Sequence, residues 1–317
     1  MDLAVDDRLA FALQQSGGVD LVAVAQLREQ VRALDLRYDR APSTSLLAET
    51  GQYLGQVAFL RTRSPSHRVR RELFAVEAEG ATLMGQLVWD ASQRRHHQGA
   101  HVYFDQAIEA ARQVRDPVAE GLALLRKSFV ALYGEMDPLN GLRLTTRTAE
   151  TTKNLSQVLT GLALLHQAEA HAMRGDQRDC ERALGTAETW FSKIKSDDAA
   201  FELFSPSQPG RLAGSCYLFL GRAELAERTL EEAARQLRDR SKAQAIVLGN
   251  LGLAYLRQRK LDEATGVLHL AIDIVELTRG GGGLNIVSGA CREMKPWRQV
   301  PAVQDVYDRV LALMAAA

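Results

Sequence analysis

Apolar residues recur every three or four positions along almost the whole chain, which is the period of an α-helix. One such face is formed by Leu21, Val24, Leu27, Val31 and Leu34. No stretch of the sequence alternates between apolar and polar residues in the way that a half-buried strand does. The pattern therefore predicts an all-α protein of about a dozen helices.

Turn residues separate the predicted helices. In Asp116-Pro117 and Asp137-Pro138 the aspartate is a suitable N-cap acceptor. The proline then takes the first helical position, where the missing amide donor is not needed. Further breaks rich in Gly, Pro and Ser fall at 16–18, 40–43, 64–66 and 205–206.

The predicted helices repeat a pattern of small and large residues. A small residue recurs at the same place in five successive helix pairs, at Ala100, Gly141, Cys180, Ala226 and Ala264. Small residues let two antiparallel helices approach, and large residues fill the gap to the next pair. The last two copies match the tetratricopeptide pattern best, although the repeats are longer than its usual length of about 34 residues. A four-helix bundle would explain the helix content but not this spacing.

We therefore predict a right-handed α-solenoid of tetratricopeptide-like helix pairs with capping helices at both ends. Residues 1–78 show no repeat and are expected to form an N-terminal helical cap or linker. About five helix pairs are expected over 79–283. Residues 284–317 are predicted to form closing helices that cover the last repeat.

Composition limits the classes of function. Lys+Arg and Asp+Glu both number 39, so the net charge is zero. The basic surplus of a typical nucleic-acid-binding domain is missing. The N-terminus lacks the basic segment followed by an apolar segment that is typical of a signal peptide. No apolar run is close to the length of about 20 residues that spans a bilayer. The three cysteines, Cys180, Cys216 and Cys291, lie far apart, which suits a reducing compartment. We expect a cytoplasmic protein with no membrane association.

Five segments carry a resemblance to a known family: LVWDASQRRHHQGAHVYFDQAIEAARQVRDP, GLALLHQAEAHAMRGDQRDCERALGTAE, RLAGSCYLFLG, KAQAIVLGNLGLAYLRQ and the tail RGGGGLN…PWRQVPAVQDVYDRV. They resemble the long C-terminal region of actinobacterial XRE-type helix-turn-helix regulators, over roughly residues 1–317. In that family a short DNA-binding domain precedes a tetratricopeptide-like sensor region. We expect this chain to lack that domain, because its first residues resemble the linker that follows it. The resemblance implies a role in transcription, without direct DNA binding by this chain alone.

Two motifs suggest chemistry only weakly. His97 and His101 share a helix face at a spacing that can bind a metal. Asp105 on the same face would lie about 12 Å from His97 along the axis, too far to join them. A solvated helix face is therefore the preferred interpretation. The glycines of 279–283 lack the strand and the Gly-Lys-Ser/Thr ending of a phosphate loop, and we expect a helix end and a flexible joint there.

One basic cluster stands out in the sequence. It comprises Arg61, Arg63, His67, Arg68, Arg70 and Arg71. Such a cluster could contact nucleic acid or an acidic partner, but a solvated loop and first helical turn is the preferred interpretation. No catalytic constellation stands out, and we predict neither an enzyme nor a bound metal or cofactor.

The remaining candidate is the concave groove, which the first helix of each pair lines in such arrays. The repeat positions predict that it is lined by Trp89, Arg126, Tyr133, Glu169, Arg211, Asn250 and Arg257. Each of these could instead lie on the surface or pack between repeats. Arg126 and Arg211 fall at the same repeat position, and arginines are suited to bind an anionic group of a ligand.

We interpret the chain as the module of a cytoplasmic transcriptional regulator that senses a peptide or small molecule in its groove, or binds a protein partner there. A stand-alone scaffold protein and a metal-dependent enzyme on a helical scaffold are the alternatives. A homodimer is also left open.

Overall fold

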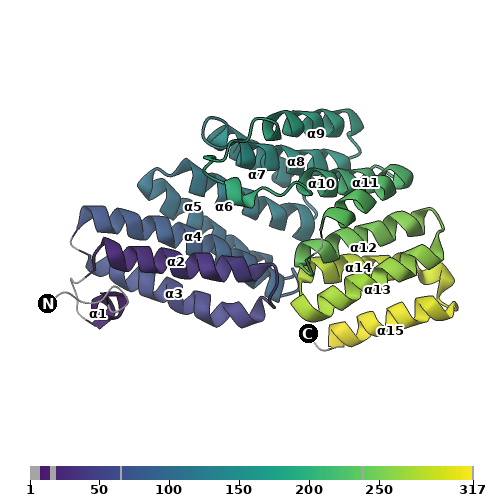
Figure 1. Ribbon diagram of the computed structural model, residues 1–317, viewed down its shortest axis with the longest axis horizontal. Coiled ribbons are helices and arrows are strands. Elements are labelled where there is room, and N and C mark those ends of the chain that lie inside the picture. The colour runs from purple at the N-terminus through teal and green to yellow at the C-terminus, as the bar shows by residue number, and fades with distance from the viewer. Residues whose placement is uncertain (1–7, 15–18, 65, 238, 316–317) are drawn as a thin grey trace.

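The computed structural model describes residues 8–14, 19–64, 66–237 and 239–315. This part of the chain contains fifteen α-helices and no strand (Figure 1). The helices are α1 (Arg8–Gln14), α2 (Leu21–Tyr38), α3 (Thr44–Arg63), α4 (His67–Ala91), α5 (His97–Val114), α6 (Pro117–Phe129), α7 (Pro138–Thr152), α8 (Gln157–Met173), α9 (Gln177–Phe191), α10 (Gln208–Phe219), α11 (Ala223–Gln236), α12 (Lys242–Arg257), α13 (Leu261–Thr278), α14 (Gly281–Glu293) and α15 (Pro301–Ala315). A π-helical turn, η2 (Val130–Gly134), extends α6.

The predicted helix starts are confirmed. The carboxylate of Asp116 accepts hydrogen bonds from the amides of Val118 and Ala119, both at 3.0 Å. Asp137 accepts one from Asn140 N at 3.0 Å. These bonds satisfy amides that have no partner within the first turn of a helix.

The helices form two layers. Each of the even-numbered helices α2 to α14 contacts the next even-numbered helix along the chain. Direct contacts between successive odd-numbered helices from α5 to α13 are sparse. Because the tighter layer lies on the inside of a curved array, we call the even-numbered helices the inner layer and the odd-numbered helices the outer layer. The predicted tetratricopeptide-like α-solenoid is thus confirmed.

The small residues that marked the repeat all lie at one structural position. Ala100, Gly141, Cys180, Ala226 and Ala264 are each the fourth residue of an outer helix, and all are buried.

Glycines on the inner helices complete the close contact within each pair. A Cβ atom at Gly252 would lie 2.7 Å from Leu268 of the paired helix. One at Gly85 would lie 2.8 Å from Phe104. The regular spacing of the small residues therefore indicates where the backbones of two paired helices lie close together.

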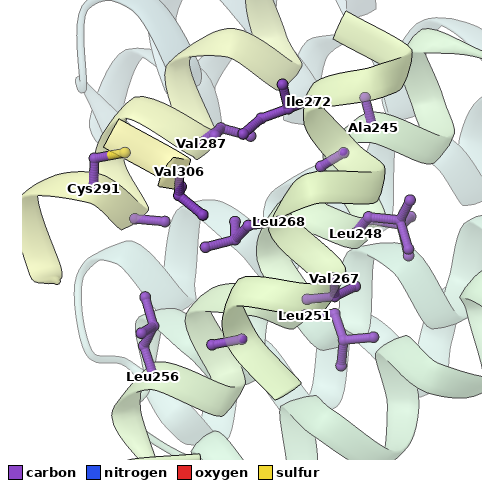
Figure 2. Packing of buried hydrophobic residues seen from close by; sticks show 14 of the residues in the cluster. Ala245, Leu248, Leu251, Leu256, Val267, Leu268, Ile272, Val287, Cys291 and Val306 are labelled. Carbon is purple, nitrogen blue, oxygen red and sulfur yellow. The ribbon is translucent and has the colours of Figure 1, made fainter. Parts of the chain in front are cut away.

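The last repeat and the closing helices share one hydrophobic core. Figure 2 shows side chains from α12, α13, α14 and α15 meeting around Leu268. Leu268, Ile272 and Val306 are fully buried, and Val287 nearly so. Shortening such a side chain to Ala typically costs about 2–5 kcal/mol of stability. The C-terminal helices therefore cover the array, as a cap does.

Two segment boundaries that the sequence predicted fall inside helices. Residue 78, where we placed the end of the N-terminal cap, lies in the middle of α4. The glycines expected to form a flexible joint instead form the first turn of α14, and Gly281 to Gly283 are all buried. At Gly281 the backbone of α4 lies close by, because a Cβ there would lie 2.9 Å from Asp90 O. A Cβ at Gly283 would lie 2.9 Å from the side chains of Ala245 and Val275. Arg279, in the left-handed conformation, ends α13.

Contacts join the N-terminal helices α2 to α4 to the C-terminal helices α12 and α14. We call the resulting closed shape the arch. Lys242 N donates to Asp39 O at 2.9 Å, which joins the start of α12 to the end of α2. The ammonium of Lys242 forms an ion pair of 2.9 Å with Asp90 at the end of α4. In Figure 1 the ends of α2 and α3 lie beside those of α12 and α14 at the centre of the arch.

Four groups make the core of this junction, and we call them the clasp: Ser43, Asp90, Lys242 and Gly281. The Ser43 hydroxyl donates to Asp90 at 2.7 Å and accepts from Lys242 at 2.7 Å. Gly281 N donates to the other oxygen of Asp90 at 2.9 Å. The side chains of Lys242 and Asp90 are only 5% and 2% exposed, so the ion pair is fully enclosed.

Candidate ligand-binding site on the inner layer

A change of helical pitch positions Tyr133. In η2 the amide of Glu135 donates to Val130 O, five residues earlier, instead of four. The extra residue rotates the side chains that follow it, and such π-turns occur frequently at functional sites. Gly134 then lets the turn pass close to α5, because a Cβ there would lie 2.8 Å from the His97 ring.

Tyr133 is held against α8 by a polar trio. Its hydroxyl donates to Glu169, and it also lies 2.7 Å from Nδ1 of His166. That Nδ1 lies 2.9 Å from the same Glu169 carboxylate. Burial raises the pKa of Tyr133 well above its usual value, and the negative charge of Glu169 raises it further. The phenol therefore remains a hydrogen-bond donor at neutral pH.

Three arginines lie near this trio. Arg94 follows the end of α4, Arg126 lies on α6 and Arg211 lies on α10. Each has a buried Nε without a hydrogen-bond partner, and none forms an ion pair within 4.0 Å in the described part of the chain. The guanidinium of Arg94 stacks on Trp89 at 4.6 Å, and that of Arg126 lies 5.4 Å from the Phe129 ring centre. Aromatic faces therefore orient two of the three cations.

The arginines are close enough to affect one another. Burial lowers the pKa of the Arg211 guanidinium, and the positive charge of Arg126 acts in the same direction. Nearby carboxylates of Asp39 and Glu169 oppose that shift without forming a contact ion pair. Guanidinium remains charged in proteins, so the result is a partly desolvated cation at Arg211 with the charge of Arg126 close by.

The end of α2 supplies acidic groups to the same region. Burial raises the pKa of Asp35, although the charge of Arg126 opposes the shift. Burial also raises the pKa of Asp39, whose carboxylate accepts a bond from Ala243 N at 3.3 Å. Asp35 is exposed to water and yet surrounded by enough protein to be desolvated, as expected on a concave face.

The predicted groove residues divide into two groups. Arg126, Tyr133, Glu169 and Arg211 lie together on α6, η2, α8 and α10.

The other three have different surroundings. Trp89 is 4% exposed, packs under Arg94, and has an Nε1 donor without a partner. Asn250 is half-buried on α12. Arg257 lies at the end of α12, where it binds Glu293 at 2.9 Å and the carbonyl of Leu218 at 2.7 Å.

Sequence reasoning missed part of the region. Arg94 follows the end of α4, beyond the repeat pattern, and so has no repeat position. Tyr38, Asp35 and Asp39 belong to the segment that shows no repeat. The ring of Tyr38 lies 4.2 Å from the Lys242 ammonium.

His97, His101 and Asp105, which share a face of α5, each contact a different group. His97 Nε2 lies 2.8 Å from the backbone oxygen of Arg94. His101 pairs with Glu135 at 2.9 Å, and Asp105 with Lys127 at 2.5 Å.

The basic cluster is partly engaged in intramolecular contacts. Arg61 pairs with Glu77 at 2.8 Å and lies over the ring of Phe74. Arg63 lies over the ring of Phe59.

No described helix combines the length and the apolar character that crossing a membrane requires. No protein-family model matches the chain, and neither does any curated protein sequence.

Solved structures share the fold, and two of them cover most of this chain. The apo form of the quorum sensor NprR from B. thuringiensis superposes with a TM-score of 0.52 at 11% identity, covering 98% of this chain and 92% of that chain. A Rap protein in complex with competence and sporulation factor has a TM-score of 0.53 at 10% identity, covering 92% of this chain and 98% of that chain. The likeness extends over the whole array and shows that the helical solenoid is a known architecture.

Proposed function

We propose that the chain is a signal-sensing module that binds a peptide or small molecule on its inner layer and acts through a protein partner. The observation that carries the proposal is the unpaired arginine group beside the Tyr133 trio. Polar groups that are buried without partners are rare in native proteins and require an explanation. A ligand that supplies the missing acceptors provides one.

The structural likeness supports the same proposal. One similar structure is described as a quorum sensor, and the other contains a bound competence and sporulation factor. The sequence resemblance to the sensor region of XRE-type regulators adds a role in transcription to this proposal. A cytoplasmic location and a homodimeric state stay predictions.

A pool of synthetic pentapeptides, mixed with the purified chain and analysed by native mass spectrometry, tests the proposal. We expect discrete bound masses that disappear when Tyr133→Ala removes the phenol from the inner layer. The matched control is Leu139→Ala, because Leu139 is 62% exposed on the outer helix α7. Peptides that still bind to the Tyr133→Ala variant would place the binding surface elsewhere. Cross-linking of a bound peptide to the outer helices would have the same meaning.

A further inference from the structure

The unpaired arginines point to the chemistry of the ligand. A buried cation without a partner is destabilising, because its lost hydration is not replaced. Two other cations of the inner layer are paired: Lys242 is enclosed with Asp90, and Arg28 on α2 contacts both Glu72 and Glu79 of α4. The fold therefore can place carboxylates beside cations, but does not do so at Arg126 and Arg211.

Three acidic groups lie near these two arginines: Asp35, Asp39 and Glu169. Asp35 is exposed and forms no ion pair within 4.0 Å among the described residues. The other two have other roles. Glu169 accepts bonds from Tyr133 and His166, and Asp39 accepts one from the first turn of α12. Neither lies within 4.0 Å of a guanidinium nitrogen of Arg126 or Arg211, as judged among the described residues. Their charges reach Arg211 through space, while the buried Nε of each arginine has no hydrogen-bond partner.

The two arginines occupy a fixed frame. Arg126 on α6 and Arg211 on α10 flank α8, which contacts both of these helices. The Phe129 ring that Arg126 lies against also contacts the His166 ring, with 4.4 Å between ring centroids. A planar guanidinium held in this way is preorganised for two-point binding of an oxyanion.

We propose that Arg126 and Arg211 form an oxyanion subsite that binds a carboxylate or phosphate group of the ligand. Arg94, stacked on Trp89, supplies a third positive charge to the same region. This inference rests on the proposed function and names the class of ligand: an acidic small molecule, or a peptide with a free carboxylate. Tyr133 is placed to donate to a second acceptor on the same ligand if its bond to Glu169 opens.

The first arm of the test needs no ligand. Arg126→Met and Arg211→Met keep the length of the side chain and remove the unpaired charge. We expect the Tm of each variant to equal or exceed that of the wild type, by about 2 °C at most. Arg309→Met on α15 is the control, because this arginine is paired with Asp273, and its Tm should not rise. A loss of several degrees in both inner-layer variants would show that the arginines are structural and would overturn the proposal.

The second arm identifies the anion. The probes are citrate, inorganic phosphate, and one pentapeptide pool prepared both as free acids and as C-terminal amides. We expect citrate or phosphate to raise the wild-type Tm, and the free-acid pool to exceed the amide pool. In Arg126→Met and Arg211→Met the affinity for the effective anion should fall at least about tenfold, whereas Arg309→Met should match the wild type.

The outcomes separate the two proposals. A response to phosphate alone assigns a phosphate subsite, and a response to citrate and free-acid peptides assigns a carboxylate subsite. If both peptide pools bind equally to wild type and to the arginine variants, the oxyanion subsite is refuted while the inner-layer binding function stands. If no anionic probe shifts the wild-type Tm, the oxyanion subsite is refuted as well.

Discussion

The clasp provides a quantitative test of how the arch is closed. Lys242→Met keeps most of the apolar volume of the side chain and removes the ammonium that contacts Asp90 at 2.9 Å and Ser43 at 2.7 Å. Asp90 then remains buried, with only the Ser43 hydroxyl and Gly281 N as donors. Breaking a buried ion pair in this way typically costs about 3–5 kcal/mol of unfolding free energy.

A control pair at the same junction isolates burial as the cause. Arg40 and Asp239 also join the two ends of the array, with an ion pair of 2.6 Å, but both side chains are 69% exposed. Exposed pairs contribute about 0–1 kcal/mol, because water screens the attraction. Arg40→Met should therefore have a small effect although it breaks a contact across the same boundary.

A double-mutant cycle distinguishes the ion pair from general packing. Asp90→Asn alone leaves the Lys242 ammonium buried beside a neutral amide and should also destabilise the protein. The combination of Asp90→Asn with Lys242→Met should cost less than the sum of the two single changes, by about 0.5–3 kcal/mol.

The measurement is urea unfolding followed by far-ultraviolet circular dichroism and by tryptophan fluorescence. Coincidence of the two curves is needed, because repeat arrays can unfold in stages. A cost below about 1 kcal/mol for Lys242→Met, or equal costs for Lys242→Met and Arg40→Met, would contradict the view that the enclosed ion pair closes the arch.

Two further predictions address the α8 start and the partner class. Burial tends to raise the pKa of Asp198, but hydrogen bonds from the Ser156 hydroxyl and the amides of Ala200, Val158 and Gln157 hold it below its usual value. The stability that this carboxylate contributes is present above the unfolded pKa of about 3.9 and is lost as pH falls through the folded pKa. Asp198→Asn should therefore cost about 1–3 kcal/mol at pH 7, with a gap to the wild type in urea titrations that closes in acid; a gap independent of pH would refute the assignment. The chain alone should bind DNA without sequence preference and no more tightly than about 10⁻⁶ M at physiological salt, as measured by fluorescence anisotropy with its own promoter and a scrambled duplex. Tight binding that discriminates between the two would instead assign direct promoter recognition.

The architecture could be predicted because its signals are local. Helical period and the spacing from Ala226 to Ala264 reflect contacts within a helix or between neighbouring helices. Each repeat buries the same small position, so one repeat supports the interpretation of the next.

The closure of the arch could not be predicted for the opposite reason. The bond from Lys242 N to Asp39 O joins residues about two hundred positions apart, and neither residue belongs to a repeated pattern. The run of glycines at 280–283 is plain in the sequence, but the sequence alone does not show which part of the chain packs against it. The π-turn at Val130–Gly134 changes the direction of Tyr133 by one inserted residue, which the helical period does not reveal.

The clasp and the proposed arginine subsite share charged neighbours. Arg94 follows the helix that ends at the clasp, and a Cβ at Gly282 would lie 2.3 Å from its guanidinium, so the first turn of α14 packs directly against this cation. Burial raises the pKa of Tyr38, the Asp90 charge raises it further, and Arg94 and Arg126 oppose the shift. An anion bound between the arginines would change the field at the same groups that hold the two ends of the array together.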